Sequence, residues 1–399
     1  MSNLGLIAES LEKVTETLAL QLGGGGKLTP DWSEFDWKIA QAAVALHGIG
    51  PTLALNLHWH APPFWKAFLA RQRDHNQVRH QRIQALTGSL LDAFKDAGIQ
   101  VLLLKGAALY RAGCYASGER PMADLDVLVR PEDRSNCAAI LSRMQYRLVL
   151  SIERHDVYEG ANAGVIHTLG EHADNPIKIE VHSRIAEKLL SQSWDITDFV
   201  SARTEHSIRA YPESRALMAH LLLHAAGGMR TKSLRLLHLG DIARLAALLT
   251  ADDWEKIVGI RAGGRPPWWA FPPLKLTCRY FPSAIPPNVM AGFESVCPAV
   301  LRSLARRTRI TGVSFSRLRM PAFAGVEWAS SAPDLFQYLV NRVVLDDEMR
   351  KLRRIEAESP VWRNDQWLRL PRWRRAIRLL TSQLPRTGTM IAVNGALGE

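Results

Sequence analysis

One stretch of the chain, Met122-Ala123-Asp124-Leu125-Asp126-Val127-Leu128-Val129, has an apolar residue at every second position from Leu125 onward. Such alternation predicts a β-strand. Side chains two residues apart point to the same face of a strand, so Asp124 and Asp126 would project side by side. Adjacent carboxylates repel each other, and they are typical of a site for a hard cation such as Mg²⁺. The alternative is a solvated edge strand that carries two acids.

Upstream, the short apolar run from Gln100 to Leu104 predicts a buried strand that ends at Lys105-Gly106 and leads into a helix. A glycine at such a turn lets backbone N–H groups approach an anion, and the start of a helix favours negative charge. The ammonium group of Lys105 could then bind a phosphate. The alternative is an ordinary tight turn with a solvated Lys105.

Downstream, the residues from Val157 to Leu169 are strand-like, and a turn-rich loop over 170–176 follows them. The run Ile177–His182 alternates cleanly, with Glu180 and His182 on its polar face. The pattern predicts a hairpin that returns a third carboxylate, Glu180, to the sheet beside the two aspartates. Taken alone, Glu180 is better explained as a surface acid paired with Lys178 or with a neighbouring strand.

Taken together, these motifs resemble the nucleotidyltransferase superfamily of the DNA polymerase beta type. The closer resemblance, over about residues 75–250, is to the bacterial uncharacterised nucleotidyltransferase family (NTP_transf_5-like). That family has a Leu-Lys-Gly turn, an arginine shortly before Asp-x-Asp and an acid-x-His strand. Here these are Lys105-Gly106, Arg120, Asp124-x-Asp126 and Glu180-x-His182. The chain departs from the superfamily in having Lys105-Gly106 where Gly-Ser is usual, and from the family in having Glu180 where aspartate is usual.

The resemblance implies transfer of a nucleoside monophosphate from an NTP to an acceptor, with release of pyrophosphate. Asp124, Asp126 and Glu180 would be the catalytic and metal-binding residues for Mg²⁺ or Mn²⁺. Lys105, Gly106 and Arg120 would contact the nucleotide phosphates, and His182 would line the nucleotide site as an orienting residue. The acceptor could be a protein, a peptide, a small molecule or RNA. The alternative functions are a non-catalytic nucleotide-binding or antitoxin-like partner protein and an Arg-rich nucleic-acid-binding adaptor.

The bulk properties exclude several other classes of protein. The chain has 399 residues, of which 47% are hydrophobic and 22% charged, as is typical of globular proteins of two or three domains. We find no apolar run of about 18 residues, so no transmembrane segment is expected. The first residues lack a basic region and soon carry Glu9, Glu12 and Glu16, which argues against a secretory signal. The four cysteines are widely spaced, which favours reduced thiols and a cytoplasmic location.

The net charge of +11 is concentrated near the end of the chain, where residues 301–399 contain 18 Arg or Lys against 9 Asp or Glu. The segments Arg350–Arg354 and Arg369–Arg375 are rich in arginine and interleaved with tryptophans. Such a surface could bind nucleic acid through phosphates and stacking, or it could bind an anionic membrane or an acidic partner. The alternative is a solvated helix face whose tryptophans pack inward.

These observations predict an α+β protein with a small mixed β-sheet as its nucleotidyltransferase core, between helical regions on both sides. We expect an N-terminal helical region over 1–97, the core over 98–190, a helical domain over 191–330 and an Arg/Trp-rich helical region over 331–399. The residues after Ser191 read as helical. In that part, His220 and His224 share one helix face, as core, site-lining or zinc-binding residues. Asp241 lies on an otherwise apolar helix and needs a partner, for which Arg235, Arg244 or a histidine are the candidates.

Overall fold

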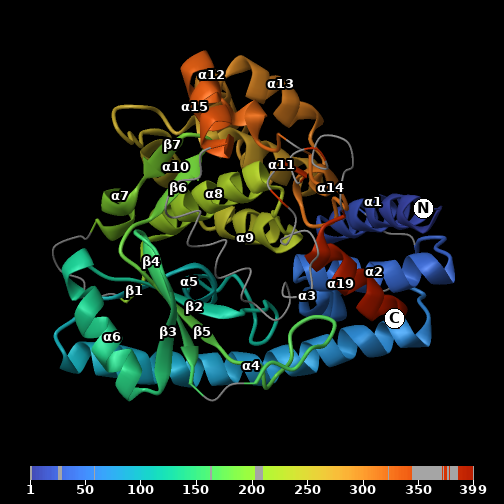
Figure 1. Ribbon diagram of the computed structural model, residues 1–399, viewed down its shortest axis with the longest axis horizontal. Helices are drawn as coiled ribbons and strands as arrows, with labels where there is room; N and C mark the ends of the chain where they lie inside the picture. The colour runs from blue at the N-terminus through green and yellow to red at the C-terminus, as the bar shows by residue number, and fades with distance from the viewer. Residues whose placement is uncertain are drawn as a thin grey trace.

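The computed structural model describes residues 2–25, 29–57, 59–161, 164–202, 210–321, 323–343, 371, 373–374, 377 and 385–398. A small β-sheet lies on a long helix on one side of the molecule, and a larger group of helices lies above it and beside it (Figure 1). This arrangement confirms the predicted α+β class. Among the described helices, none is both long enough and apolar enough to cross a bilayer.

The sheet has five strands in the order β1-β2-β5-β4-β3. The strands are β1 (Leu102–Leu103), β2 (Asp124–Leu128), β3 (Tyr146–Ser151), β4 (His155–Gly160) and β5 (Lys178–His182). β2 and β5 run parallel, whereas the other three neighbouring pairs are antiparallel, so the sheet is mixed as predicted. Since β4 pairs antiparallel with β5, the expected return of Glu180 to the sheet beside the Asp-x-Asp strand is confirmed.

The two faces of the sheet have opposite chemistry because β2 and β5 alternate in step. Leu125, Val127, Ile179 and Val181 are all buried against the helices below. Those helices are α4 (Pro63–Asp96) and α6 (Arg134–Arg143), the latter following a short 3₁₀ turn, η1 (Pro131–Asp133). The opposite face carries the acids of both strands.

The N-terminal region is helical, as the sequence predicts. It contains α1 (Ser2–Leu22), α2 (Glu34–His47), α3 (Gly50–Asn56) and the start of α4. Ser33 begins α2 with a capping box, since its hydroxyl accepts a hydrogen bond from the Asp36 backbone and the Asp36 carboxylate accepts one from the Ser33 backbone. Helix α2 ends at Gly48, whose backbone is left-handed with a φ of 66°.

Helices also follow the sheet. They are α7 (Thr197–Ser201), α8 (Ser214–Thr231), α9 (Leu236–Ala246), α10 (Ala251–Val258), α11 (Phe271–Tyr280), α12 (Pro287–Val296), α13 (Ala299–Arg307), α14 (Ile310–Val313), α15 (Ala332–Val343) and α19 (Thr387–Leu397), with two 3₁₀ turns, η2 (Trp268–Ala270) and η3 (Val326–Trp328). One hydrophobic core joins most of them to α1–α4, and α19 packs against α2 near the other end of the chain (Figure 1). The helices before and after the sheet therefore share a single interior.

Two sequence predictions are wrong at this level. The strand expected over Val157–Leu169 ends at Gly160, and a second small sheet appears, whose second strand lies where helix was expected after Ser191. This sheet is a hairpin of β6 (Ala186–Leu189) and β7 (Gln192–Asp195). It forms around Trp194, which is fully buried against Trp268 and Trp269. The basic segment Arg350–Arg354, and most of Arg369–Arg375, lie outside the described residues.

Candidate functional site

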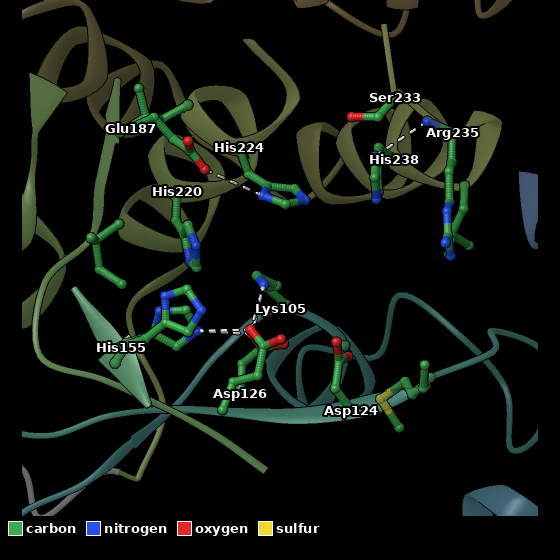
Figure 2. A pocket seen from close by; sticks show the side chains of 18 of the residues that line it. Lys105, Asp124, Asp126, His155, Glu187, His220, His224, Ser233, Arg235 and His238 are labelled. Atoms are coloured by element: carbon green, nitrogen blue, oxygen red, sulfur yellow. Dashed lines mark hydrogen bonds and ion pairs between the residues drawn. The ribbon is translucent and has the colours of Figure 1, made fainter. Parts of the chain in front are cut away.

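The acids predicted from the sequence meet on the upper face of the sheet. Parallel pairing places Asp126 directly beside Glu180, and Leu128 beside His182. Asp126 is buried, whereas Asp124 and Glu180 are partly exposed. Figure 2 shows Asp124 and Asp126 pointing from β2 into a cavity of about 450 Å³. The side chains of Asp126, Glu180 and His182 offer ligand atoms that lie within 4.8 Å of one another.

Two nitrogen groups hold these carboxylates together. Lys105 precedes Gly106 at the start of α5 (Lys105–Arg111), and its Nζ lies 2.6 Å from Asp126 Oδ1 and 4.0 Å from Glu180 Oε2. His182 Nε2 lies 3.0 Å from Asp126 Oδ1 and 3.4 Å from Glu180 Oε2. Lys105 and His182 therefore each lie within ion-pair distance of both carboxylates.

The electrostatics of the cluster separate the two aspartates. Burial and the charge of Asp126 raise the pKa of Asp124 to about 6. Burial would also raise the pKa of Asp126, but Lys105 and His182 outweigh it and hold that pKa well below its ordinary value. Burial opposes the charge of Lys105 as well, and the neighbouring carboxylates outweigh it and raise the pKa of the amine. Asp126 is therefore the permanent anion of the site, and Asp124 is the acid that takes up a proton most easily.

The Lys105-Gly106 turn is shaped by close packing. The backbone of Lys105 has a φ of +42°, which is uncommon for a residue with a side chain and recurs at functional sites. A Cβ atom added at Gly106 would lie 2.6 Å from Nη1 of Arg120 and would also collide with Met122. Glycine is therefore required here so that α5 can approach the strand that carries the acids.

Arg120 lines the same cavity, but an acid already binds its guanidinium group. Nε and Nη2 of Arg120 donate to the two carboxylate oxygens of Asp241 on α9, at 2.7 and 2.8 Å. Tyr115 also donates to Asp241, at 2.7 Å, and Asp241 is completely buried. The partners suggested for Asp241 from the sequence were wrong, since Arg120, 121 residues away, takes that place.

Histidines cover the cavity on the side away from the aspartates. His220 and His224, on one face of α8 as expected, lie across the cavity from Lys105 (Figure 2). His224 Nδ1 lies 3.8 Å from Glu187 Oε1 on β6, and Arg154 lies 3.1 Å from the other oxygen of Glu187. Burial opposes the charge of Glu187, but His224 and Arg154 outweigh it and lower its pKa to about 2.

Sequence reasoning did not find every residue of the cavity wall. The additional polar and aromatic lining residues are Arg154, His155, Arg184, Glu187, Ser233, Arg235, His238 and Phe315. They come from several parts of the chain that only the fold brings together, so no sequence motif marks them. The one local cue was the acid-x-His strand. Its His182 lies opposite His155 of β4 in the sheet.

The donor set fits one divalent cation. Two carboxylates and one imidazole converge in the group formed by Asp126, Glu180 and His182. The carboxylate oxygens suit Mg²⁺ or Mn²⁺, whereas an imidazole nitrogen suits transition metals. The ammonium group of Lys105 supplies positive charge beside the same carboxylates. Asp124 lies on the same strand face but outside this group of three.

Comparison with known proteins gives a match to a family model. Neither the curated proteins nor the solved structures gave a match. A family model described as "Uncharacterised nucleotidyltransferase" (NTP_transf_5) matches residues 33–262, which is more than half of the chain and includes the whole five-stranded sheet, α8 and α9. The chain therefore belongs to this nucleotidyltransferase family.

Proposed function

We propose that the protein transfers a nucleoside monophosphate from an NTP to an acceptor hydroxyl or amine and releases pyrophosphate. The observation that carries this proposal is the register of β2 and β5. It places Asp126 beside Glu180 on a face that opens into the cavity, with Lys105-Gly106 at its edge. Family membership supports the reaction class, and the cavity offers room for a nucleotide and the end of an acceptor.

In the proposed reaction the acceptor oxygen or nitrogen forms a bond to the α-phosphorus, and the bond from that phosphorus to the pyrophosphate oxygen breaks. Glu180 takes the proton that the acceptor loses. A divalent metal at Asp124, Asp126 and Glu180 would supply Lewis acidity at the phosphate oxygens. His182 contacts both Asp126 and Glu180, so it orients their carboxylates and can join the ligand set.

Lys105 has a distinct role in this proposal. Its ammonium group neutralises Asp126. It lies beside the Gly106 turn and can contact the transferring phosphate. Arg120 keeps its bond to Asp241 and holds the wall behind Gly106, so we assign it to the nucleotide site as a neighbour of the phosphate-binding turn.

The test uses each of the four NTPs labelled at the α-phosphate, with Mg²⁺ or Mn²⁺, and with or without lysate of the source cell as a supply of acceptors. The protein is compared with Asp126→Asn, and with Asp96→Asn as a matched control, because Asp96 is an exposed acid at the end of α4. We expect label on an acceptor with the natural protein and the control, and at least 100-fold less with Asp126→Asn.

The chemical nature of the labelled product identifies the acceptor class. Tight NTP binding without transfer under any condition would contradict the proposal and favour the binding-protein alternative. Equal labelling by Asp126→Asn would show that the acids of β2 are not the reacting site.

A further inference from the structure

The cavity contains one cation without an acidic partner. Five Lys or Arg side chains line it, namely Lys105, Arg120, Arg154, Arg184 and Arg235. The first four are paired with Asp126, Asp241, Glu187 and Glu153, at 2.6, 2.7, 3.1 and 3.0 Å. Among the described residues, no carboxylate lies within ion-pair distance of Arg235. Unlike the other four cations, the guanidinium group of Arg235 makes no ion pair with a carboxylate of the described residues.

Arg235 is also placed to meet a ligand. It is the exposed residue immediately before α9, and its guanidinium group lies 5.7 Å from the centre of the Phe315 ring. Figure 2 shows Arg235 and Asp124 on the same side of the cavity, with His155 on the other side. A guanidinium group beside an aromatic ring keeps its charge and its five N–H donors, so Arg235 can still bind an anion.

A second hollow meets the cavity at this residue. It has a volume of about 870 Å³ and lies between α2, α19 and the loop over 167–171. Arg235, Phe315, Pro121, Ala123 and Leu237 line both spaces. Glu171 also lines this hollow and is paired with Arg79, at 3.7 Å. A chain of phosphates that begins over the aspartates can therefore extend past Arg235 toward solvent.

The charge of the proposed substrate requires such a group. An NTP carries several negative charges on its β- and γ-phosphates, and a planar guanidinium group can bind two phosphate oxygens at once. Arg120 cannot do so without leaving a buried Asp241 unpaired, which is costly. We propose that Arg235 binds the β- and γ-phosphates of the NTP, so that pyrophosphate leaves toward Arg235 and the acceptor approaches from the histidine side. This inference rests on the proposed function, because it assigns a direction to the same reaction.

The test compares the binding of AMP, ADP and ATP, and then of the other three nucleotide series, by isothermal titration calorimetry with Mn²⁺ and without acceptor. Variant Arg235→Gln removes the charge and keeps much of the side-chain length. The matched control is Arg184→Gln, because Arg184 lines the same cavity but is already paired with Glu153. We expect Arg235→Gln to weaken triphosphate binding about 10-fold or more while monophosphate binding changes less than 3-fold. Arg184→Gln should leave both affinities nearly unchanged, and Arg235→Lys should recover part of the loss.

A second measurement uses a ligand without a nucleoside as inhibitor of the labelling reaction. Inorganic pyrophosphate should inhibit labelling by the natural protein, and this inhibition should weaken about 10-fold in Arg235→Gln. If the natural protein transfers label but Arg235→Gln keeps the same ratio of triphosphate to monophosphate affinity, this inference is overturned and the proposed function stands. If the natural protein neither binds nor transfers any nucleotide, both are overturned.

Discussion

At the scale of single residues, the site is defined by which charges are already paired. Asp126 is bound by Lys105 and His182, whereas Asp124 has neither as a contact within ion-pair distance. Arg120 and Arg235 both face the cavity, yet only Arg120 has a carboxylate partner among the described residues. Pairing with a carboxylate therefore distinguishes the two arginines. Arg120 stabilises the wall of the cavity, and Arg235 remains available to a ligand.

The first prediction concerns Gly106. Replacement by alanine places a methyl group against Met122 and Arg120, so α5 or β2 must shift. We expect Gly106→Ala to lower the free energy of unfolding by about 1–3 kcal/mol and to reduce nucleotidyl transfer at least 10-fold. Urea unfolding and labelled-NTP transfer measure the two effects. Gly88→Ala is the matched control, because Gly88 lies within α4 with open space around it, and that change should stabilise the protein by about 0.5–1 kcal/mol. If both alanines behave alike, packing at Gly106 is not limiting.

The second prediction concerns the Arg120–Asp241 pair. Asp241→Asn leaves a buried guanidinium group without its counter-charge, and we expect a loss of about 3–5 kcal/mol in the free energy of unfolding. The double variant Arg120→Met/Asp241→Leu removes both charges and should lose less than Asp241→Asn alone, although Tyr115 then lacks its acceptor. Unfolding curves of Arg120→Met, Asp241→Leu and the double variant give the coupling energy. A coupling energy near zero would mean that the two charges stabilise the wall independently.

At the scale of secondary-structure elements, a buried polar chain fixes the start of α9 beside the cavity. Thr15 on α1 contacts Ser316, and Ser316 contacts Nε2 of His47 on α2, at 2.7 and 2.9 Å. Nδ1 of His47 accepts a hydrogen bond from the backbone N–H of Leu236, at 3.0 Å. This series of hydrogen bonds connects α1 and α2 to the start of α9. Leu236 follows Arg235, so the series ends next to the residue that we propose as the phosphate ligand.

The third prediction follows from the charge state of His47. Complete burial, and then the charge of Arg235, lowers the pKa of His47 to about 3. Below about pH 6.5 the unfolded chain takes up a proton at this residue, but the folded protein does not until about pH 3. Stability should therefore fall as the pH drops through this window, by up to about 1.4 kcal/mol per pH unit from this histidine alone.

The measurement is urea unfolding at several values of pH between 7.5 and 5. His47→Gln should be less stable at neutral pH and should show a pH slope shallower by about one proton. His60→Gln should keep the slope of the natural protein, because His60 is exposed. An unchanged slope in His47→Gln would mean that other buried histidines account for the acid sensitivity.

The elements also show what the sequence can predict. Alternation and glycine boundaries were sufficient for β2, for β5 and for the side-by-side placement of Asp126 and Glu180, because local pattern sets the face of a strand. The β6–β7 hairpin was not predicted, and the residues of β7 were read as helical because they follow Ser191. There, burial of Trp194 against Trp268 and Trp269 overrides local preference. Likewise, no spacing rule connects Arg120 to Asp241, because only the folded chain brings them together.

At the scale of the whole molecule, α4 connects the five-stranded sheet to the helices. Trp65, Phe68 and Leu69 in its first half belong to the large helical core. Ile83, Leu90 and Phe94 in its second half belong to the core beneath the sheet. A continuous helix of 34 residues therefore contributes to both interiors. It carries Arg79, which donates to the backbone carbonyls of Met122 and Ala123 just before β2 and of Pro176 just before β5.

The fourth prediction is that the described part of the chain unfolds as one unit, because disrupting either half of α4 weakens both cores. Phe68→Ala and Phe94→Ala should each lower the free energy of unfolding by about 3–5 kcal/mol within a single shared transition. All twelve tryptophans lie outside residues 98–190, so their fluorescence reports on the helices, while amide hydrogen exchange of β2 and β5 reports on the sheet. In Phe94→Ala, the two probes should shift together. If exchange in β2 and β5 speeds up while tryptophan emission keeps its original midpoint, the sheet unfolds separately. In that case the acids on β2 and the cation before α9 are held together only by the contacts across the cavity.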